Sequence, residues 1–205
     1  MKRATLVRNC IAFVSVLAGT LTLSVNRAGA SVIIDIKQVG SNVVATGSGT
    51  LNLTDLILDG SIGNSGAMRP SEPGIIEGPP SSSTILWFYL GITGPSSFGS
   101  GGGIFASSGS GDTFGLSVNI SGALVVPEHY VSGSSLAGTD TYSGQTFSSL
   151  GLTPGKYTWT WGTGVNADSL TVDVVPEPCT LTLAGIAAAS GLGYFGWRRR
   201  KLAVV

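Results

Sequence analysis

Apolar and polar residues alternate along the chain from residue 31 onward. Val32, Ile34 and Ile36 alternate with Ile33, Asp35 and Lys37. A period of two places the first set on one face of a β-strand. The same pattern predicts a second strand with one wet face, in which Phe114, Leu116, Val118 and Ile120 alternate with Gly115, Ser117 and Asn119.

A hairpin is predicted near the end of this region. Tyr157, Trp159 and Trp161 share one strand face, and Leu170, Val172 and Val174 share another. The polar, glycine-containing segment Gly162–Asp168 would be the loop between the two strands.

Four further segments complete the pattern. Asn42–Thr54 is interpreted as two strand pieces interrupted by Gly47-Ser48-Gly49, and Asp59–Ser83, rich in Gly, Pro and Ser, as a loop. Thr84–Thr93 is apolar on both faces and is expected to be the central, most buried strand. Ser96–Gly103 is a glycine-serine linker.

Because no part of residues 31–175 has helical periodicity, we expect an all-β fold, a single β-sandwich or jelly-roll-like domain.

The first thirty residues have the layout of a secretory signal peptide. Lys2, Arg3 and Arg8 precede the apolar stretch Cys10–Val25, and Ala28-Gly29-Ala30 is a small-x-small cleavage site. We therefore expect recognition by the Sec machinery, cleavage by signal peptidase and a mature chain that begins at Ser31. An uncleaved N-terminal anchor is the alternative, which the clean cleavage site disfavours.

The last thirty residues combine three signals. Pro176-Glu177-Pro178 is followed by the uncharged stretch Thr180–Trp197 and then by Arg198, Arg199, Arg200 and Lys201. Eighteen residues in a helix span about 27 Å, which is sufficient for the hydrocarbon core of a membrane. The four cations predict that the C-terminus lies in the cytoplasm. Physics alone leaves open a plain tail anchor and a processed signal.

This tail resembles the sorting signal of the PEP-CTERM proteins, bacterial exported proteins whose C-terminal tag is read and cut by a membrane protease, exosortase. The module is also labelled in some schemes as an ice-binding protein C-terminal domain, a label that says nothing about ice binding here. The resemblance implies a transient inner-membrane intermediate and a mature form at the cell surface or outside the cell. It divides the chain into a signal peptide (1–30), an exported β domain (31–175) and a sorting signal (176–201).

The body also resembles a recurring group of small PEP-CTERM proteins. The resemblance is carried by Val43–Leu56, Pro127–Gly133 and Gly151–Val172. It implies a shared exported β domain and carries no catalytic residues to transfer.

The body itself is acidic. Residues 31–175 contain three cations and ten acids, a net charge of −7. An acidic surface repels phosphate backbones, so nucleic acid is not an expected partner. The body has no cysteine, which excludes a disulfide framework.

Candidate chemistry in the body is sparse. His129 is the only histidine, which with the lack of cysteine excludes Cys/His metal sites, and it more plausibly serves a turn. No catalytic residue, metal ligand set or cofactor site is therefore assigned. Paired carboxylates remain open, because proximity in a fold is invisible in a sequence. Asp112, Glu128, Asp140 and Asp168 stand in turn-like surroundings, where solvated loop carboxylates are the common case.

The stripe Tyr157, Trp159 and Trp161 is the one feature with the chemistry to contact a sugar. The alternating Lys156, Thr158 and Thr160 mark the wet face, so a core role is favoured for the aromatic residues. Trp87 and Tyr89 are interpreted in the same way.

Two functional classes follow. The first is a non-enzymatic protein of the cell surface or extracellular matrix, associated with exopolysaccharide. The second is a secreted polysaccharide-binding module or hydrolase, which would place acids in an open cleft beside exposed Trp159 or Trp161.

Overall fold

Two β-sheets form the body of the protein. The computed structural model describes residues 31–80 and 84–176. Six strands make sheet A, in the order β12 (Gly155–Trp161), β13 (Asp168–Val175), β1 (Ser31–Val39), β2 (Asn42–Thr50), β11 (Ser135–Tyr142) and β8 (Ser108–Gly111). Seven make sheet B, in the order β3 (Ile57–Asn64), β6 (Thr84–Leu90), β10 (Ala123–Pro127), β9 (Phe114–Leu116), β5 (Gly74–Glu77), β4 (Ala67–Arg69) and β7 (Ile104–Phe105).

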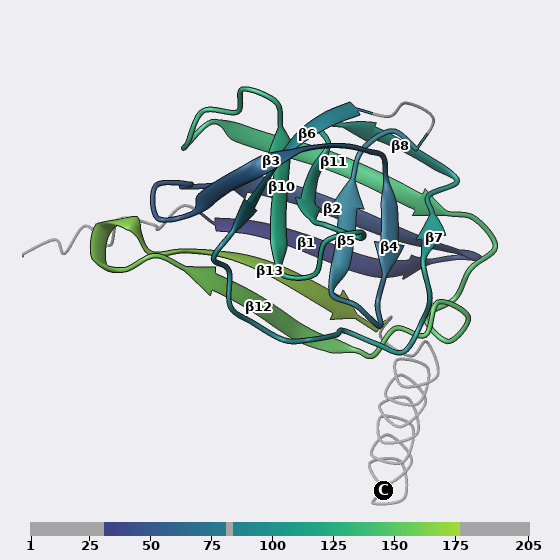
Figure 1. Ribbon diagram of the computed structural model, residues 1–205. Helices are drawn as coiled ribbons and strands as arrows, with labels where there is room; N and C mark the ends of the chain where they lie inside the picture. Colours follow the sequence, from purple (N-terminus) through teal and green to yellow (C-terminus); the bar gives the residue numbers. More distant parts are fainter. Residues whose placement is uncertain (1–30, 81–83, 177–205) are drawn as a thin grey trace, which may run out of the picture.

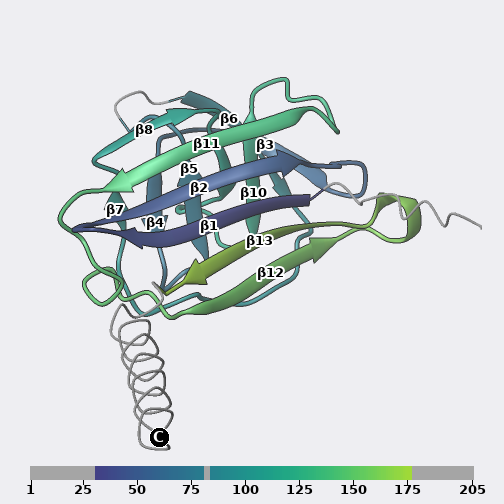
Figure 2. The same cartoon turned by 180° about the vertical axis from the view of Figure 1, so that it is seen from behind.

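The two sheets pack face to face, and the core lies between them. Figures 1 and 2 show β4, β5 and β10 of sheet B crossing β1, β2 and β11 of sheet A steeply, an orthogonal arrangement. The main core contains inward residues of both sheets, such as Ile34 and Leu170 from sheet A and Ile75 and Leu124 from sheet B. The only helix within the described residues is the 3₁₀ turn Gly164–Asn166. The predicted all-β class is confirmed.

The strand β1 and the hairpin β12–β13 follow their sequence patterns. Val32, Ile34 and Ile36 are fully buried. Trp159 pairs with Leu170 and Trp161 with Asp168 across the hairpin. Strand β13 continues as the parallel neighbour of β1, with Ser31 opposite Ser169 and Lys37 opposite Val175. The start of β1 and the end of β13 therefore lie at opposite ends of sheet A.

The prediction that Gly47-Ser48-Gly49 interrupts the second strand is wrong. Strand β2 runs through these glycines and pairs with β1 on one side and with β11 on the other. Gly47 faces the interior, where a Cβ would lie 2.9 Å from Phe114 Cζ and 3.1 Å from Glu77 Cγ. The glycine therefore makes room for two side chains from sheet B.

The interpretation of Asp59–Ser83 as a loop is also wrong. This segment contains most of β3 and all of β4 and β5. All four residues of β5 are buried. These short strands are stabilised by partners distant in sequence, because β5 pairs with β9 and β3 pairs with β6.

Two predicted strands differ from the observed ones. Strand β6 ends at Leu90 and lies between β3 and β10, with only Leu86 and Tyr89 buried, so it is not the most buried strand. Strand β9 ends at Leu116, because Ser117 Oγ accepts the backbone N–H groups of Asn119 and Ile120 and turns the chain. Ser96–Gly103 forms no strand, as expected, but it is packed, since Phe98 is fully buried.

Candidate functional site

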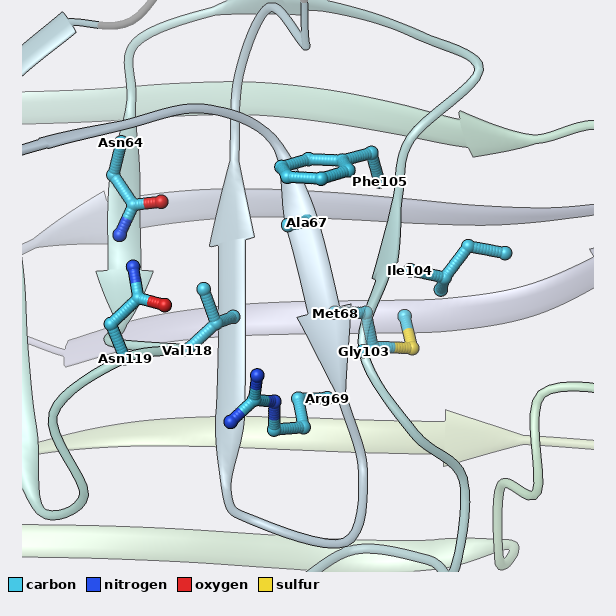
Figure 3. A pocket seen from close by; sticks show the side chains of 9 residues that line it. All are labelled: Asn64, Ala67, Met68, Arg69, Gly103, Ile104, Phe105, Val118 and Asn119. Carbon is cyan, nitrogen blue, oxygen red and sulfur yellow. The ribbon is translucent and has the colours of Figure 1, made fainter.

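A small pocket lies on the face of sheet B that is turned away from sheet A. Its volume is about 160 Å³. Residues from four places in the chain line it, as Figure 3 shows: Asn64, Ala67, Met68, Arg69, Gly103, Ile104, Phe105, Val118 and Asn119. The end of β3, the strand β4, the edge strand β7 and the turn after β9 therefore meet at this pocket.

Arg69 supplies the positive charge of the pocket. It is the last residue of β4, and its Nη1 donates to Glu72 Oε2 at 2.9 Å. A Cβ on Gly103 would lie 3.3 Å from Arg69 Nε and 3.6 Å from Nη2. Gly103 therefore places no side chain against this edge of the guanidinium.

Two asparagine side chains line the opposite side. Asn64 is only 7% exposed; its Oδ1 accepts the N–H of Ser65 at 3.2 Å, and its Nδ2 is buried without a partner. Asn119 is exposed at the turn that Ser117 holds. Figure 3 shows the two carboxamide groups turned toward one another. A buried amide donor with no acceptor is uncommon, because it loses its bonds to water and gains none in return.

Apolar groups complete the walls. Phe105 is 67% exposed and stands above the pocket in the view of Figure 3. Ile104 and Val118 are half-buried beside it. The pocket thus combines one guanidinium, two carboxamides and an exposed aromatic ring. No sequence pattern predicted this pocket, although Arg69 is one of only three cations in residues 31–175.

Two acids lie buried between the sheets. Glu77 of β5 and Asp140 of β11 are both fully buried. Asp140 Oδ1 accepts the N–H of Gly78 at 3.2 Å, whereas Asp140 Oδ2 and both oxygens of Glu77 have no partner. The hydroxyl of Tyr142 on β11 is also buried without a partner.

Burial is the main cause of the shifted pKa values of Glu77 and Asp140. It raises the pKa of the Asp140 carboxyl to about 7, against the smaller opposing effect of the Gly78 N–H. Burial, and then the charge of Asp140, raise the pKa of Glu77 well above its ordinary value. Near neutral pH these carboxyls therefore tend to hold protons, since a charge in a dry interior is costly. The expectation that Asp140 is a solvated loop carboxylate is wrong.

Asp168 is the second acid that differs from the expectation. It is 7% exposed and accepts the N–H groups of Asn52 and Ser169, both at 2.6 Å. Burial raises its pKa above the ordinary value, and the two N–H groups lower it by less. Asp168 lines an open hollow of about 440 Å³ with Trp161, and it is the only carboxylate in that lining. Asp112, by contrast, lies in an exposed turn, where it accepts the N–H of Ala137.

The aromatic stripe of β12 is mostly core. Trp159 and Trp161 are 2% and 4% exposed, and their indole N–H groups donate to the carbonyls of Pro95 and Asn52. Tyr157 is half-buried, and its hydroxyl donates to Thr153 O at 3.0 Å. The core interpretation is confirmed for both tryptophans, and their ring faces are closed to a sugar.

His129 and Tyr89 have structural roles. His129 has a φ of 64° in an exposed turn, and its ring meets the edge of Trp87 with centroids 4.8 Å apart. Its predicted role in a turn is confirmed. Tyr89 is 8% exposed.

In the part of the chain that the structure describes, no three His, Cys, Asp or Glu side chains gather closely enough to hold a metal ion.

The described part of the chain ends at Pro176, the first residue of the Pro-Glu-Pro box. Pro176 is exposed and follows β13 directly. Glu177, Pro178, the segment Thr180–Trp197 and the basic cluster Arg198–Lys201 lie outside the described residues, as does the signal peptide with Ala28 and Ala30. Among the described residues no helix is both long and apolar enough to cross a membrane.

Comparison with known proteins identifies the tail. Residues 174–201 match the family model described as the PEP-CTERM protein-sorting motif. Comparisons with curated proteins and with solved structures each gave no match. The motif implies an exported protein that exosortase sorts, with a C-terminal membrane anchor.

Proposed function

We propose that this protein is a non-enzymatic component of the cell surface or extracellular matrix. Exosortase removes its tail at the outer face of the inner membrane, and the body, residues 31–175, then associates with exopolysaccharide. The membrane is a transient location, in which the basic cluster Arg198–Lys201 keeps the C-terminus in the cytoplasm.

The position of the sorting motif carries this proposal. The match begins at residue 174, inside β13, and Pro176 is exposed directly after the last strand residue. Pro176 has no N–H and cannot extend the ladder between β12 and β1. The last described strand thus overlaps the first two residues of the motif, so a cut beyond Val175 leaves every described strand intact.

The buried acids support a role without catalysis. Glycoside hydrolysis requires two carboxyl groups on either side of a bound sugar linkage. Glu77 and Asp140 are fully buried between the sheets, and Asp168 stands alone in its hollow. Glu77 and Asp140 are therefore shielded from a bound sugar, and Asp168 has no partner carboxylate in its hollow, so none of these three acids supports the hydrolase alternative.

The outer face of sheet A supports a matrix environment. Hydroxyl side chains cover much of it, and they form cross-strand contacts between Thr46 and Thr139 at 3.3 Å and between Thr158 and Thr171 at 3.0 Å. Hydroxyl groups donate and accept hydrogen bonds without adding charge. Such a surface is compatible with a hydrated polysaccharide.

The test replaces Pro176, Glu177 and Pro178 together by alanine. Cell fractionation should find this variant in the inner membrane at the longer mass, whereas the wild type is released. A matched control replaces Pro127, the last residue of β10, and Glu128, the exposed turn residue that follows it, and should be released normally. Equal release of the triple variant and the wild type would show that the tail is a plain anchor.

A further inference from the structure

We propose that the pocket formed by Asn64, Arg69, Phe105 and Asn119 binds one carboxylate-bearing sugar residue, a uronic acid unit of an acidic polysaccharide. This inference rests on the proposed association with exopolysaccharide and assigns the residues and the class of sugar. Figure 3 shows the pocket from its open side.

The unpartnered donor is the first reason to expect a ligand. The hydrogen bond from Ser65 N–H to Oδ1 holds the carboxamide of Asn64 in place. The Nδ2 of the same group is buried and has no acceptor in the protein. Asn64 lines the pocket but its Nδ2 is covered, so a ligand oxygen supplies the missing acceptor once the side chains that cover this nitrogen move aside. The carboxamide of Asn119 approaches the same place from the turn after β9.

The charge of the pocket is the second reason, and it selects an acidic ligand. The nine lining residues include one cation, Arg69, and no carboxylate, although the body as a whole carries a net charge of −7. Glu72 is bonded to one guanidinium nitrogen, while Gly103 places no side chain against the edge with Nε and Nη2. A guanidinium with amide donors nearby suits a carboxylate, which only accepts hydrogen bonds. At physiological salt the distant acids of the body are largely screened.

The aromatic ring is the third reason, and it points to a sugar. Phe105 lies on the edge strand β7 with 67% of its surface exposed, a position in which a large apolar side chain gains little from the fold. A flat ring beside hydrogen-bonding groups matches the two sides of a sugar, since its C–H face is apolar and its edge is polar. A pocket of about 160 Å³ accommodates one small ring, with the rest of the chain continuing outside.

The experiment measures binding to the full-length chain in detergent by titration calorimetry at pH 7. The probes are a galacturonate trimer and a neutral glucose trimer. We expect the acidic trimer to bind at least tenfold more tightly than the neutral one, and to bind less tightly as salt is raised.

Variants locate the site. Phe105→Ala removes the ring, and Asn64→Asp keeps the acceptor for Ser65 while replacing the free donor by an oxygen. Each should weaken binding of the acidic trimer at least tenfold. Asn119→Ala, at an exposed position, is a third variant that leaves the core untouched. Ile57→Ala is the matched control, because Ile57 is 68% exposed at the start of β3, at the other end of that strand from Asn64, and it should bind as the wild type does.

The outcomes separate this inference from the proposed function. Wild-type protein that binds neither trimer, or both equally, overturns the assignment of an acidic sugar. Binding that survives all three pocket variants places the site elsewhere and overturns the inference. Release from the membrane is scored in the same strains and should be unchanged in the pocket variants. Wild-type protein that binds the acidic trimer yet keeps its tail would instead refute the proposed function.

Discussion

Glycine residues make room for the buried carboxyl groups between the sheets. Gly47 and Gly138 form a cross-strand pair, and a Cβ at Gly138 would lie 2.9 Å from Glu77 Cβ. At Gly109 of β8 a Cβ would overlap Asp140 Oδ1 and the carbonyl of Gly78. The glycines of these strands are therefore required by close approach to the acids, and not only by turns.

Replacing Gly109 by alanine should lower the free energy of unfolding by about 1–3 kcal/mol, because the backbone of Gly78 and the carboxyl of Asp140 must move. Gly102→Ala is the control, since a Cβ there meets nothing within 4 Å. Urea denaturation followed by circular dichroism measures both changes. Equal stability of the two variants would contradict the packing account.

The carboxyls of Glu77 and Asp140 should make the body less stable as pH rises. In the unfolded chain such groups titrate at about pH 4, whereas burial raises the folded pKa of Asp140 to about 7 and raises that of Glu77 well above its ordinary value. Between these limits the folded state binds more protons than the unfolded state. The stabilising contribution of these two carboxyls is then complete below about pH 4, and it is lost as pH rises toward and through their folded pKa values.

Thermal melting at pH 5 and pH 8 measures this loss. We expect the melting temperature to fall by at least several degrees, since about 1 kcal/mol corresponds to roughly 3 °C in a domain of this size. The double variant Glu77→Gln, Asp140→Asn cannot titrate at these positions and should show a smaller difference, of which Asp168, whose pKa burial also raises, supplies a part. A wild type that is more stable at pH 8 would contradict the proposed protonation.

Strands are stabilised by their inward residues. In β1 the neighbouring residues Ile33 and Ile34 differ sharply, since Ile34 is fully buried in the core and Ile33 is 47% exposed on the outer face of sheet A. Central position in the sheet, between β13 and β2, makes each inward residue of β1 contact both flanking strands and the facing sheet.

Ile34→Ala should therefore lower the free energy of unfolding by about 2–5 kcal/mol, through lost burial and the cavity left behind. Ile33→Ala removes the same atoms from the exposed face and should cost about 1 kcal/mol or less. Chemical denaturation of the two variants gives the comparison. Similar losses would contradict burial on one face only, and a larger loss for Ile33→Ala would mean that the register of β1 is shifted by one residue.

At the scale of the whole molecule, the two ends of the body lie at opposite ends of one sheet. Strand β1 begins at Ser31 and its parallel neighbour β13 ends at Val175, and Figures 1 and 2 both show the β13 arrow pointing away from the start of β1. The signal-peptide junction and the sorting motif are therefore separated by the length of the sheet. Each of the two processing events can take place without unfolding the other end.

We expect the mature protein to begin at Ser31 and to end at or after Val175. Val32 is fully buried and Val174 is 1% exposed, so a cut inside either strand would remove core residues. Intact mass spectrometry of the released form, with N-terminal sequencing, checks both ends. A mature chain that starts at Met1, or one that lacks Val174, would contradict this expectation.

Sequence alone was sufficient where the signal is local. The alternation in β1 and in the β12–β13 hairpin predicted which residues are buried, because a strand with one wet face has a period of two whatever its partners are. The sorting motif was likewise recognisable from the Pro-Glu-Pro box, the apolar stretch and the basic cluster in one continuous segment. Export and sorting by exosortase follow from that segment without reference to the body.

Tertiary structure decided what depends on distant partners. Strands β4 and β5 are too short, and too closely flanked by Gly, Pro and Ser, to be predicted, and they exist because β5 pairs with β9 and β4 with β7. Asp140 lies in a polar stretch of the sequence. Strand β11 nevertheless pairs with both β2 and β8, and this position places the side chain of Asp140 in the core. The pocket needs Asn64, Arg69, Phe105 and Asn119 from four separate segments. Such convergence is set by how the sheets fold over one another, and no local pattern encodes it.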